Sequence, residues 1–354
     1  LIFAGGAAAD ASWNATVNGT EVTVTYEGEG EADDPYQISN VTELQAIGKN
    51  ETTLNYHYEL SKNINASETT SWINGGFQPI GKAVDKKFGG VTSAQNTFDG
   101  NGYDINNVFI QTGTQAGLFY ETGYTKISNL TISNISILGD ATDGAEFVGA
   151  LAGATSGGPN QIRTTIQNVH VNGNISRIAE NGDNRPFHGG LVGDLDDGHI
   201  IRSSFTGTVN KNGTVGGIAG RGRNGAIINT SYFSGDLESN NQIFAFADDS
   251  SLSVNDSYSH VSLAADSTFG ISGDDVSLTD VYVRIDSGSV DTIKTLDSNP
   301  VDAYVIDETG SSQSFGLTTV TVENATGIPA VDAMAFDWGD TWRVTESFPE
   351  LVAF

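Results

Sequence analysis

Two short patterns recur along the chain in a fixed order and at a nearly constant distance, and this repetition restricts the possible folds more than any other feature. The first pattern is an apolar hexapeptide with glycines at set positions, as in HGGLVG at 188–193 and VGGIAG at 215–220. Its copies begin at Val148, His188, Val215, Gln242 and Ser267. From His188 onward they are 27, 27 and 25 residues apart, a period typical of proteins built from stacked structural repeats.

The second pattern follows each copy of the first and alternates apolar with polar residues. It reads IRSSFTGTV at 201–209 and INTSYFSGDL at 228–237, with late copies spaced by 27, 26 and 24 residues. Its other copies begin at Ile127, Ile166, Val254 and Leu278. The two-residue alternation predicts strands, and no stretch of about ten residues has the period of a helix. Each period therefore holds two or three short strands.

Stacked periods of this kind predict an all-β fold, a parallel β-helix (β-solenoid) of roughly eight coils whose strands pair with their copies about 4.8 Å above and below. The handedness of the helix is left open. Equivalent positions should form columns, and we expect one polar column to point into the stack: Asn129, Asn168, Ser203, Thr230, Asp256 and Asp280. We expect an aromatic column beside it, as a structural ladder rather than a sugar-stacking surface: Phe205, Tyr232, Tyr258 and Tyr282.

Both ends of the chain differ from the repeats, as the caps of a stacked protein do. Residues 1–34 are predicted to be an N-terminal extension with one β-strand, EVTVTY, and an acidic linker. The β-helix is predicted to cover 35–352, with an N-terminal cap at 35–64 and a C-terminal aromatic cap at 316–352.

Each cap has its own local signal. Asn40 precedes Glu43 by three residues, the spacing of a capping box, and predicts a short helix that runs through Ile47. Near the other end, 331–336 is predicted to form a helical turn. Three aromatic residues after it are expected to form a plug over the last coil: Trp338, Trp342 and Phe348.

The Gly-Leu-Val-Gly strand at 190–193, followed by the strand at 201–209, and the pair 217–220 with 228–237 resemble a known family. They are similar to the GLUG-motif β-helix modules of bacterial and archaeal surface proteins, of the haloarchaeal type. The resemblance covers about 35–352, although the Gly-Leu-Val-Gly signature is lost in the later copies. It implies a β-helix and an extracellular location, and no single activity.

The charge of the chain excludes some partners. Acidic side chains number 44 against 16 basic ones, which gives a net charge of −28. Such a chain repels nucleic acid and anionic lipid headgroups, and it has no run of apolar residues long enough to span a bilayer. Scattered acidic residues with few lysines are typical of a surface adapted to high salt, where screening removes the self-repulsion. There are no cysteines, so thiol chemistry is excluded.

Twelve Asn-x-Ser/Thr sequons indicate an exported glycoprotein. Asn129 is expected to be a poor acceptor because its column should point inward. The candidate acceptors for glycans are Asn14, Asn18, Asn65, Asn174, Asn212 and Asn324.

Catalytic motifs of the common hydrolases are absent, since the sequence contains neither His-Glu-x-x-His nor Gly-x-Ser-x-Gly. The five histidines are scattered, and His188 and His199 are interpreted as corner residues rather than zinc ligands. The acidic cluster of Asp194, Asp196 and Asp197, with Arg202 nearby, is interpreted as a solvated corner. The chain is therefore predicted not to be an enzyme.

A calcium loop is a weaker alternative. The segment from Asp99 to Asp104 has alternating oxygen ligands but lacks the closing glutamate of a calcium loop. It is therefore interpreted as a corner of the first coils, and neither a metal nor another cofactor is predicted.

The sequence predicts an extracellular structural or adhesive module of the cell surface that self-associates or binds other surface-protein subunits, as in a filament or sheath. Two alternatives stay open: a β-helix that binds or cleaves carbohydrate, with surface glycans as partners, and a spike or tail fibre of a halophile virus. The candidate subunit contacts are Leu1, Ile2 and Phe3, because an uncharged apolar terminus gains from burial against a neighbouring subunit or against its own β-helix.

The net charge generates a test. Self-repulsion is screened beyond about 3 Å in 1 M salt but only beyond about 30 Å in 0.01 M salt. We therefore expect the chain to melt at a lower temperature in 0.01 M than in 1 M potassium chloride. Equal melting temperatures in calorimetry would remove the argument for a salt-adapted surface.

Overall fold

The computed structural model describes residues 11–351 with gaps. The residues outside the description are 1–10, 90–94, 113–114, 140–146, 158–162, 178–186, 249–250, 264–266, 271–272, 274–275, 288–289, 295–300, 308–317, 322–341, 345–348 and 352–354. The candidate contacts Leu1, Ile2 and Phe3 lie outside this description, as do the sequon at Asn324 and the helical turn expected at 331–336.

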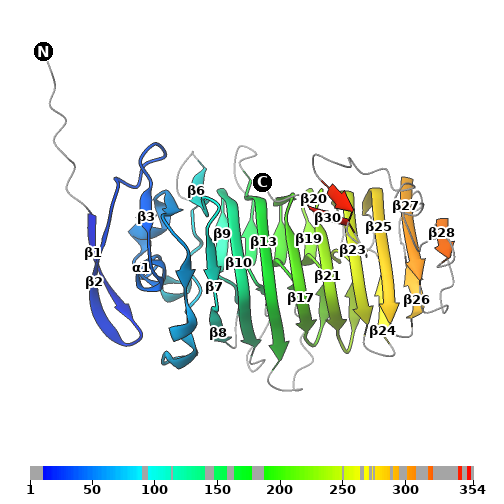
Figure 1. Ribbon diagram of the computed structural model, residues 1–354, viewed down its shortest axis with the longest axis horizontal. Helices are drawn as coiled ribbons and strands as arrows, with labels where there is room; N and C mark the ends of the chain where they lie inside the picture. Colours follow the sequence, from blue (N-terminus) through cyan, green and yellow to red (C-terminus); the bar gives the residue numbers. More distant parts are fainter. Residues whose placement is uncertain are drawn as a thin grey trace, which may run out of the picture.

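The chain begins with an antiparallel hairpin of β1 (Ala11–Val17) and β2 (Thr20–Tyr26), at one end of the molecule (Figure 1). One strand was predicted here, so β1 is an addition. The signal for it was the Asn18-Gly19 dipeptide, which favours the two-residue hairpin turn in which both central residues have positive φ. Both do so here, with φ values of 48° and 74°.

The cap that follows consists of β3 (Tyr36–Ile38), α1 (Val41–Ala46) and β4 (Tyr58–Leu60). The predicted helix start is confirmed, since the Asn40 side chain accepts a hydrogen bond of 2.9 Å from the backbone N–H of Glu43. The rest of the cap and its connection to the coils contain η1 (Glu51–Asn55), β5 (Ile64–Asn65), η2 (Ser67–Ser71) and η3 (Lys82–Val84).

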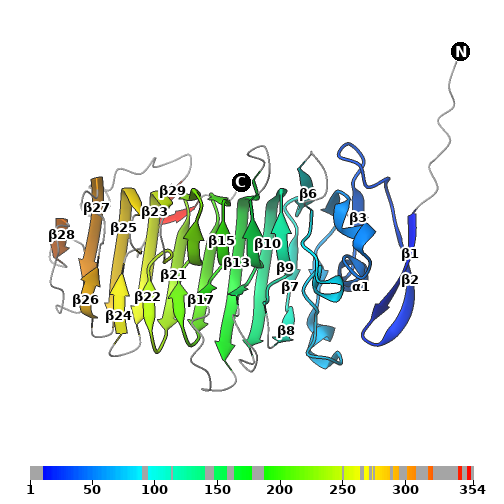
Figure 2. The ribbon, with the colours of Figure 1, turned by 180° about the vertical axis from the view of Figure 1, so that it is seen from behind.

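Beyond the cap, parallel strands stack one rung upon another (Figures 1 and 2). The longest sheet contains β6 (Asn96–Asp99), β7 (Asp104–Asn106), β8 (Phe109–Thr112), β10 (Thr125–Gly139), β13 (Thr165–Arg177), β16 (His199–Ile201), β17 (Ser204–Asn210), β20 (Ala226–Asn229), β21 (Tyr232–Glu238), β23 (Leu252–Leu263), β25 (Ser277–Ser287), β27 (Val301–Asp307) and β28 (Thr318–Thr321). The path β6-β10-β13-β16-β20-β23-β25-β27 has eight rungs, and β28 adds a short ninth. The parallel β-helix of roughly eight coils is confirmed.

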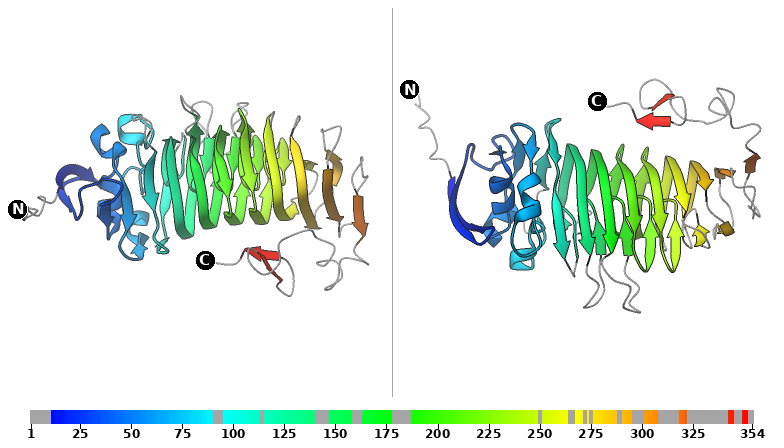
Figure 3. Two further views of the ribbon diagram at one scale, coloured as in Figure 1. Left: turned by 90° about the horizontal axis from the view of Figure 1, so that it is seen from above. Right: turned by 60° about the horizontal axis from the view of Figure 1, so that its bottom comes forward.

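Two further sheets complete the coils, as the views in Figure 3 show. One contains β11 (Phe147–Gly149), β14 (Phe187–Gly189), β18 (Thr214–Gly216), β22 (Gln242–Phe244), β24 (Ser267–Gly270) and β26 (Val290–Lys294). The other contains β9 (Phe119–Gly123), β12 (Ala152–Ser156), β15 (Val192–Asp196) and β19 (Ala219–Arg223). Near the C-terminus, β29 (Trp342–Val344) and β30 (Pro349–Leu351) pair antiparallel. The expected aromatic plug depends on side chains outside the description.

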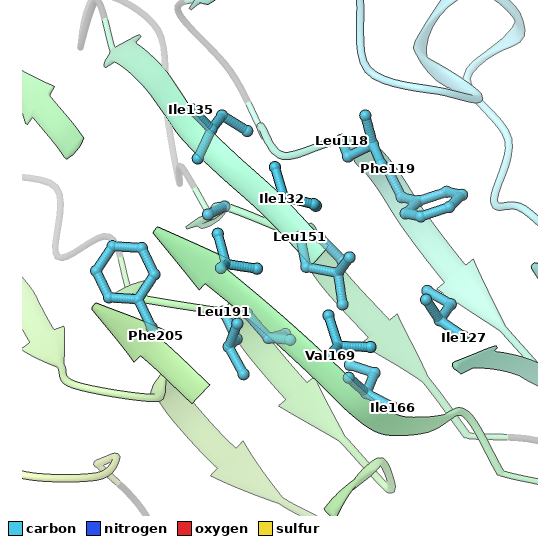
Figure 4. Packing of buried hydrophobic residues seen from close by; sticks show 14 of the residues in the cluster. Leu118, Phe119, Ile127, Ile132, Ile135, Leu151, Ile166, Val169, Leu191 and Phe205 are labelled. Atoms are coloured by element: carbon cyan, nitrogen blue, oxygen red, sulfur yellow. The ribbon is translucent and has the colours of Figure 1, made fainter. Parts of the chain in front are cut away.

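The core consists of apolar columns that run through the stack, part of which is shown in Figure 4. In one column, Ile127 pairs with Ile166, and Ile166 pairs with Ile200 of the next rung. All three side chains are fully buried. Each inward side chain therefore contacts its own copies above and below, which explains why the sequence pattern repeats with the coil.

The predicted polar column is aligned except at Ser203, whose place is taken by Arg202, but it lies at a bend of the strand rather than inside the stack. Asn129 is exposed, and the pairs on either side of it align it with Asn168 and then with Arg202, not with Ser203. These corner residues have left-handed backbones, with φ values of 52°, 54° and 47°. A left-handed residue bends the strand and resets its alternation, so the residue after the corner points inward. The prediction that Asn129 points into the stack is therefore wrong.

The inward position after the corner holds a serine ladder. Ser203, Ser231 and Ser257 are fully buried in three successive rungs. The Ser231 hydroxyl accepts from the backbone N–H of Ser203 and donates to the carbonyl of Asn229, and the hydroxyls of the other two make equivalent bonds. Each hydroxyl thus satisfies main-chain groups at the bend that would otherwise be unpaired.

The aromatic column also splits into two. Phe205 pairs in register with Phe233, and their buried rings stack at 6.2 Å with an interplanar angle of 7°. Tyr232 belongs to the neighbouring column, where it pairs with Ser204 and Tyr258. The expected ladder is therefore wrong at Phe205, whereas Tyr232, Tyr258 and Tyr282 share one column as predicted.

A glycine column gives a test of the close packing between rungs. At Gly235, φ is 147° and an added Cβ would lie 1.9 Å from the carbonyl oxygen of Gly207. At Gly225, φ is 81° but the added Cβ would meet nothing within 4 Å. We expect Gly235→Ala to lower the free energy of unfolding by more than about 3 kcal/mol and Gly225→Ala by about 1 kcal/mol. Denaturant titration of both variants measures the difference, and equal effects would contradict the packing argument.

Candidate functional site

The acidic cluster singled out by the sequence lies on the sheet formed by β9, β12, β15 and β19. In the register of this sheet, Asp194 pairs with Arg221 of the next rung, and Asp196 pairs with Arg223. The two arginines are each one period of 27 residues after an aspartate. The repeat therefore places two acidic side chains directly against two basic ones.

Asp194 is at the centre of this cluster, with a side chain that is only 3% exposed. Its carboxylate accepts two hydrogen bonds from the Arg221 guanidinium, at 3.1 and 2.7 Å. Arg223 binds the same carboxylate at 3.0 Å and also reaches Asp196 at 2.9 Å. The cluster contains two carboxylates and two guanidinium groups, so its formal charges cancel.

Aromatic rings cover one side of the cluster. The guanidinium carbon of Arg221 lies 4.4 Å from the ring centroid of Phe187 and 5.4 Å from that of Phe147. The two rings stack at 6.3 Å. A cation over an aromatic face is attracted to it, so Arg221 is held both by Asp194 and by the rings. Three strands, β11, β14 and β15, thus contribute contacts to Arg221.

The third acid, Asp197, belongs to a separate group at the adjoining corner. Its carboxylate binds Arg163 at 3.0 Å, and Arg163 also contacts the His199 ring at 2.7 Å. Burial and the Arg163 charge lower the pKa of His199, and Asp197 opposes them. Arg202, the cation expected nearby, lies at the left-handed corner of another sheet.

The interpretation of the three acids as a solvated corner is therefore wrong for Asp194, which is buried and neutralised. Its partners Arg221 and Arg223 were not predicted, although each follows an aspartate of the cluster by the 27-residue period. Chemically, the cluster joins β15 to β19 through ion pairs. Its carboxylates are already bound by cations, which does not leave them placed as a general acid and base.

The segment from Asp99 to Asp104 folds as a corner. The Asp99 carboxylate accepts hydrogen bonds from the Asn101 backbone and from the side chains of Ser128 and Asn129. These donors occupy the oxygens that a calcium ion would use. Among the residues that the structure describes, no group of three or more His, Asp or Glu side chains could hold a metal ion.

His188 is buried in the stack rather than at a solvated corner. Its Nε2 atom lies 3.0 Å from the carbonyl oxygen of Asn212. Burial, and secondarily the charge of Lys211, lower the pKa of His188 well below its ordinary value of 6.5, while the bond to Asn212 opposes the shift. The neutral ring is therefore the form that the folded chain accommodates.

The sequons differ in accessibility. Asn14, Asn65 and Asn174 are exposed, Asn212 is half-buried, and Asn18 is exposed while its side-chain oxygen accepts from the Ile73 backbone. Asn129 is exposed too, but its side-chain nitrogen donates to Asp99 at 3.1 Å. Its low competence as a glycan acceptor stays a prediction, now because the nitrogen is engaged rather than because it is buried.

Comparison with known proteins supports the fold. No family model matches the chain. It is 40% identical over 194 residues to Halomucin of Haloquadratum walsbyi, a match that covers 53% of this chain and 2% of that protein. It is 29% identical over 239 residues to the immunoglobulin A1 protease of Streptococcus sanguinis, which covers 57% of this chain and 11% of that protein. The chain thus spans a small fraction of both relatives.

Solved structures of similar shape place the chain in the same structural class. A crystal structure of a Bacteroides ovatus protein, provisionally named an immunoglobulin A1 protease, matches with a TM-score of 0.56 at 16% identity, over 92% of this chain and 94% of that one. A structure named IgA1 Protease matches with a TM-score of 0.50 at 15% identity, over 89% of this chain and 26% of that one. At these identities the similarity concerns the fold.

The ion-pair cluster predicts a specific loss of stability. Asp194→Asn keeps the shape of the side chain but removes the negative charge that Arg221 and Arg223 bind. We expect the free energy of unfolding to fall by about 2 to 3 kcal/mol, less than for a fully buried pair because Arg223 is partly solvated. Asp236→Asn, at an exposed acid of β21, should change it by less than about 0.5 kcal/mol. Denaturant titration in 1 M salt distinguishes the two, and a neutral Asp194→Asn would show that the cluster does not clamp the rungs.

The buried histidine predicts a pH dependence. Because the folded pKa of His188 is depressed, the unfolded chain binds a proton below pH 6.5 that the folded chain resists. The contribution of His188 to the free energy of unfolding should therefore be fully present above pH 6.5. It should decline as the pH falls below 6.5, by at most about 1.4 kcal/mol per pH unit for one proton. We expect denaturant titrations between pH 6.5 and 5 to show that the stability of His188→Gln depends less on pH than that of the unaltered chain, and an equal dependence would contradict the role of His188.

Proposed function

We propose that this chain is an extracellular module of the cell surface of a salt-loving microbe, where it acts as a stiff structural or adhesive element. The observation that carries the proposal is the use of charge. Asp194 and Asp196 are neutralised by ion pairs with arginines of the next rung, so the net charge of −28 comes from acidic residues elsewhere in the chain. This arrangement favours a rod that stays folded and soluble in strong salt.

The comparisons support the setting. The relative named Halomucin comes from Haloquadratum walsbyi. The names Halomucin and Haloquadratum share the prefix for salt, in agreement with the acidic composition of this chain. The immunoglobulin A1 proteases matched by sequence and by shape are named as enzymes. The sequence match covers 11% of the Streptococcus protein, so we infer that the shared part is an accessory β-helix and that this chain is not itself a protease.

The location is tested by surface labelling of cells that express the gene. An antibody raised against the chain should label intact cells in growth medium, and an antibody against a cytoplasmic protein should label them only after lysis. Label confined to lysed cells would contradict the proposal. Label on released virus particles, with none on cells, would favour the viral spike instead.

The non-enzymatic role is tested with the purified chain. Beads coated with it should adhere to the same cells in molar salt without releasing peptide or sugar fragments. Release of fragments that grows with time would contradict the structural or adhesive role and favour a hydrolase.

A further inference from the structure

A pocket of about 380 Å³ lies between the N-terminal hairpin and the cap of the stack. Its volume is within the range of about 300 to 1,000 Å³ that is usual for small-molecule sites. The hairpin contributes one wall, and the segment after η2 contributes the other. The lining residues on which the argument depends are Asn14, Glu21, Lys49, Trp72, Ile73 and Asn74.

The walls of the pocket are held in place by specific contacts. The Asn18 side-chain oxygen accepts a hydrogen bond of 2.7 Å from the backbone N–H of Ile73 and so ties the hairpin turn to the opposite wall. Gln45 and Gln78 bind each other reciprocally, side-chain nitrogen to carbonyl at 2.9 Å and backbone N–H to side-chain oxygen at 2.7 Å. The pocket is therefore formed before any ligand binds.

Lys49 gives the pocket an ammonium group that is bound by an amide rather than by a carboxylate. Its ammonium group donates to the neutral side-chain oxygen of Gln78 at 2.6 Å. Burial lowers its pKa to about 8, and no carboxylate among the described residues offsets that shift. Glu21 is the other charged lining residue, and it is exposed. In a chain of net charge −28, a half-buried ammonium held by an amide is suited to an anionic ligand.

The remaining lining groups have the mixed character of a sugar site. Asn14 and Asn74 provide amides that can bind hydroxyl groups. Ile73 provides apolar surface, because it is 55% exposed, the one large apolar side chain so exposed among the described residues, whereas Trp72 in the same lining is nearly buried. Sugars present hydroxyl groups at their edges and an apolar face, and both kinds of surface have a counterpart here.

We propose that this pocket binds an acidic sugar, with the sugar carboxylate on the Lys49 ammonium and the ring against Ile73. The inference rests on the proposed function and specifies it, since it names the ligand class of an adhesive surface module. Because the bound carboxylate stabilises the charged amine, ligand binding raises the pKa of Lys49.

Calorimetry with sodium galacturonate as the probe, at pH 7 in 1 M salt, tests this directly. We expect galacturonate to bind at least tenfold more tightly than neutral galactose. Lys49→Gln should weaken galacturonate binding at least tenfold, while Lys62→Gln, which removes an exposed ammonium from the same cap, should leave it unchanged. An NMR titration of the Lys49 side chain should give a higher pKa with galacturonate than with galactose.

Binding of galactose as tight as that of galacturonate, an unaffected Lys49→Gln variant, or no binding of either sugar would each overturn the acidic-sugar site. A melting scan checks that Lys49→Gln folds, and the comparison of the two sugars on the unaltered chain stands even where it does not. Surface labelling is independent of this pocket, so failure here leaves the proposed location intact, and failure there leaves the binding result intact.

Discussion

Main-chain hydrogen bonds join each coil to the next in a fixed parallel register, and the other features of this protein depend on that register. A one-residue change in pairing would move each inward side chain to the outer face. The apolar columns, the serine ladder and the Asp194 cluster all require that equivalent residues lie directly above one another. The glycine column requires it too, because Gly235 comes within contact distance of the Gly207 carbonyl only in this alignment.

The register also explains how so acidic a chain folds. Asp194 is buried, which would be costly for an unpaired carboxylate. The rung above supplies Arg221 and Arg223 at the matching positions, and the stacked rings of Phe147 and Phe187 support one of them. The remaining acids can stay in solvent, where salt screens them. The chain has few basic residues, and Arg221 and Arg223 form ion pairs that join neighbouring rungs.

The pocket beside Lys49 follows a different principle. It lies where the repeat has not begun, between a hairpin and an irregular cap, so its residues come from segments with no copies elsewhere in the chain. Residues of the repeats pack against a coil on each side. Residues of the cap pack against a coil on one side only, so their other side is available to bind a ligand. An adhesive function at the end of a stiff stack is consistent with this division.

The sequence by itself determined the fold class, the approximate number of coils and the helix start at Asn40, because the two patterns repeat with the period of the coil and the capping box is local. Tertiary structure decided what periodicity cannot express. A left-handed residue at Asn129, Asn168 or Arg202 resets the alternation, so the inward column contains Ser203 and not the corner residues. Burial of Asp194 and His188 depends on neighbouring rungs, and the Lys49 pocket depends on the docking of a hairpin whose first strand was not predicted. These contacts join residues far apart in the chain, and a local sequence pattern does not predict which distant residues come together.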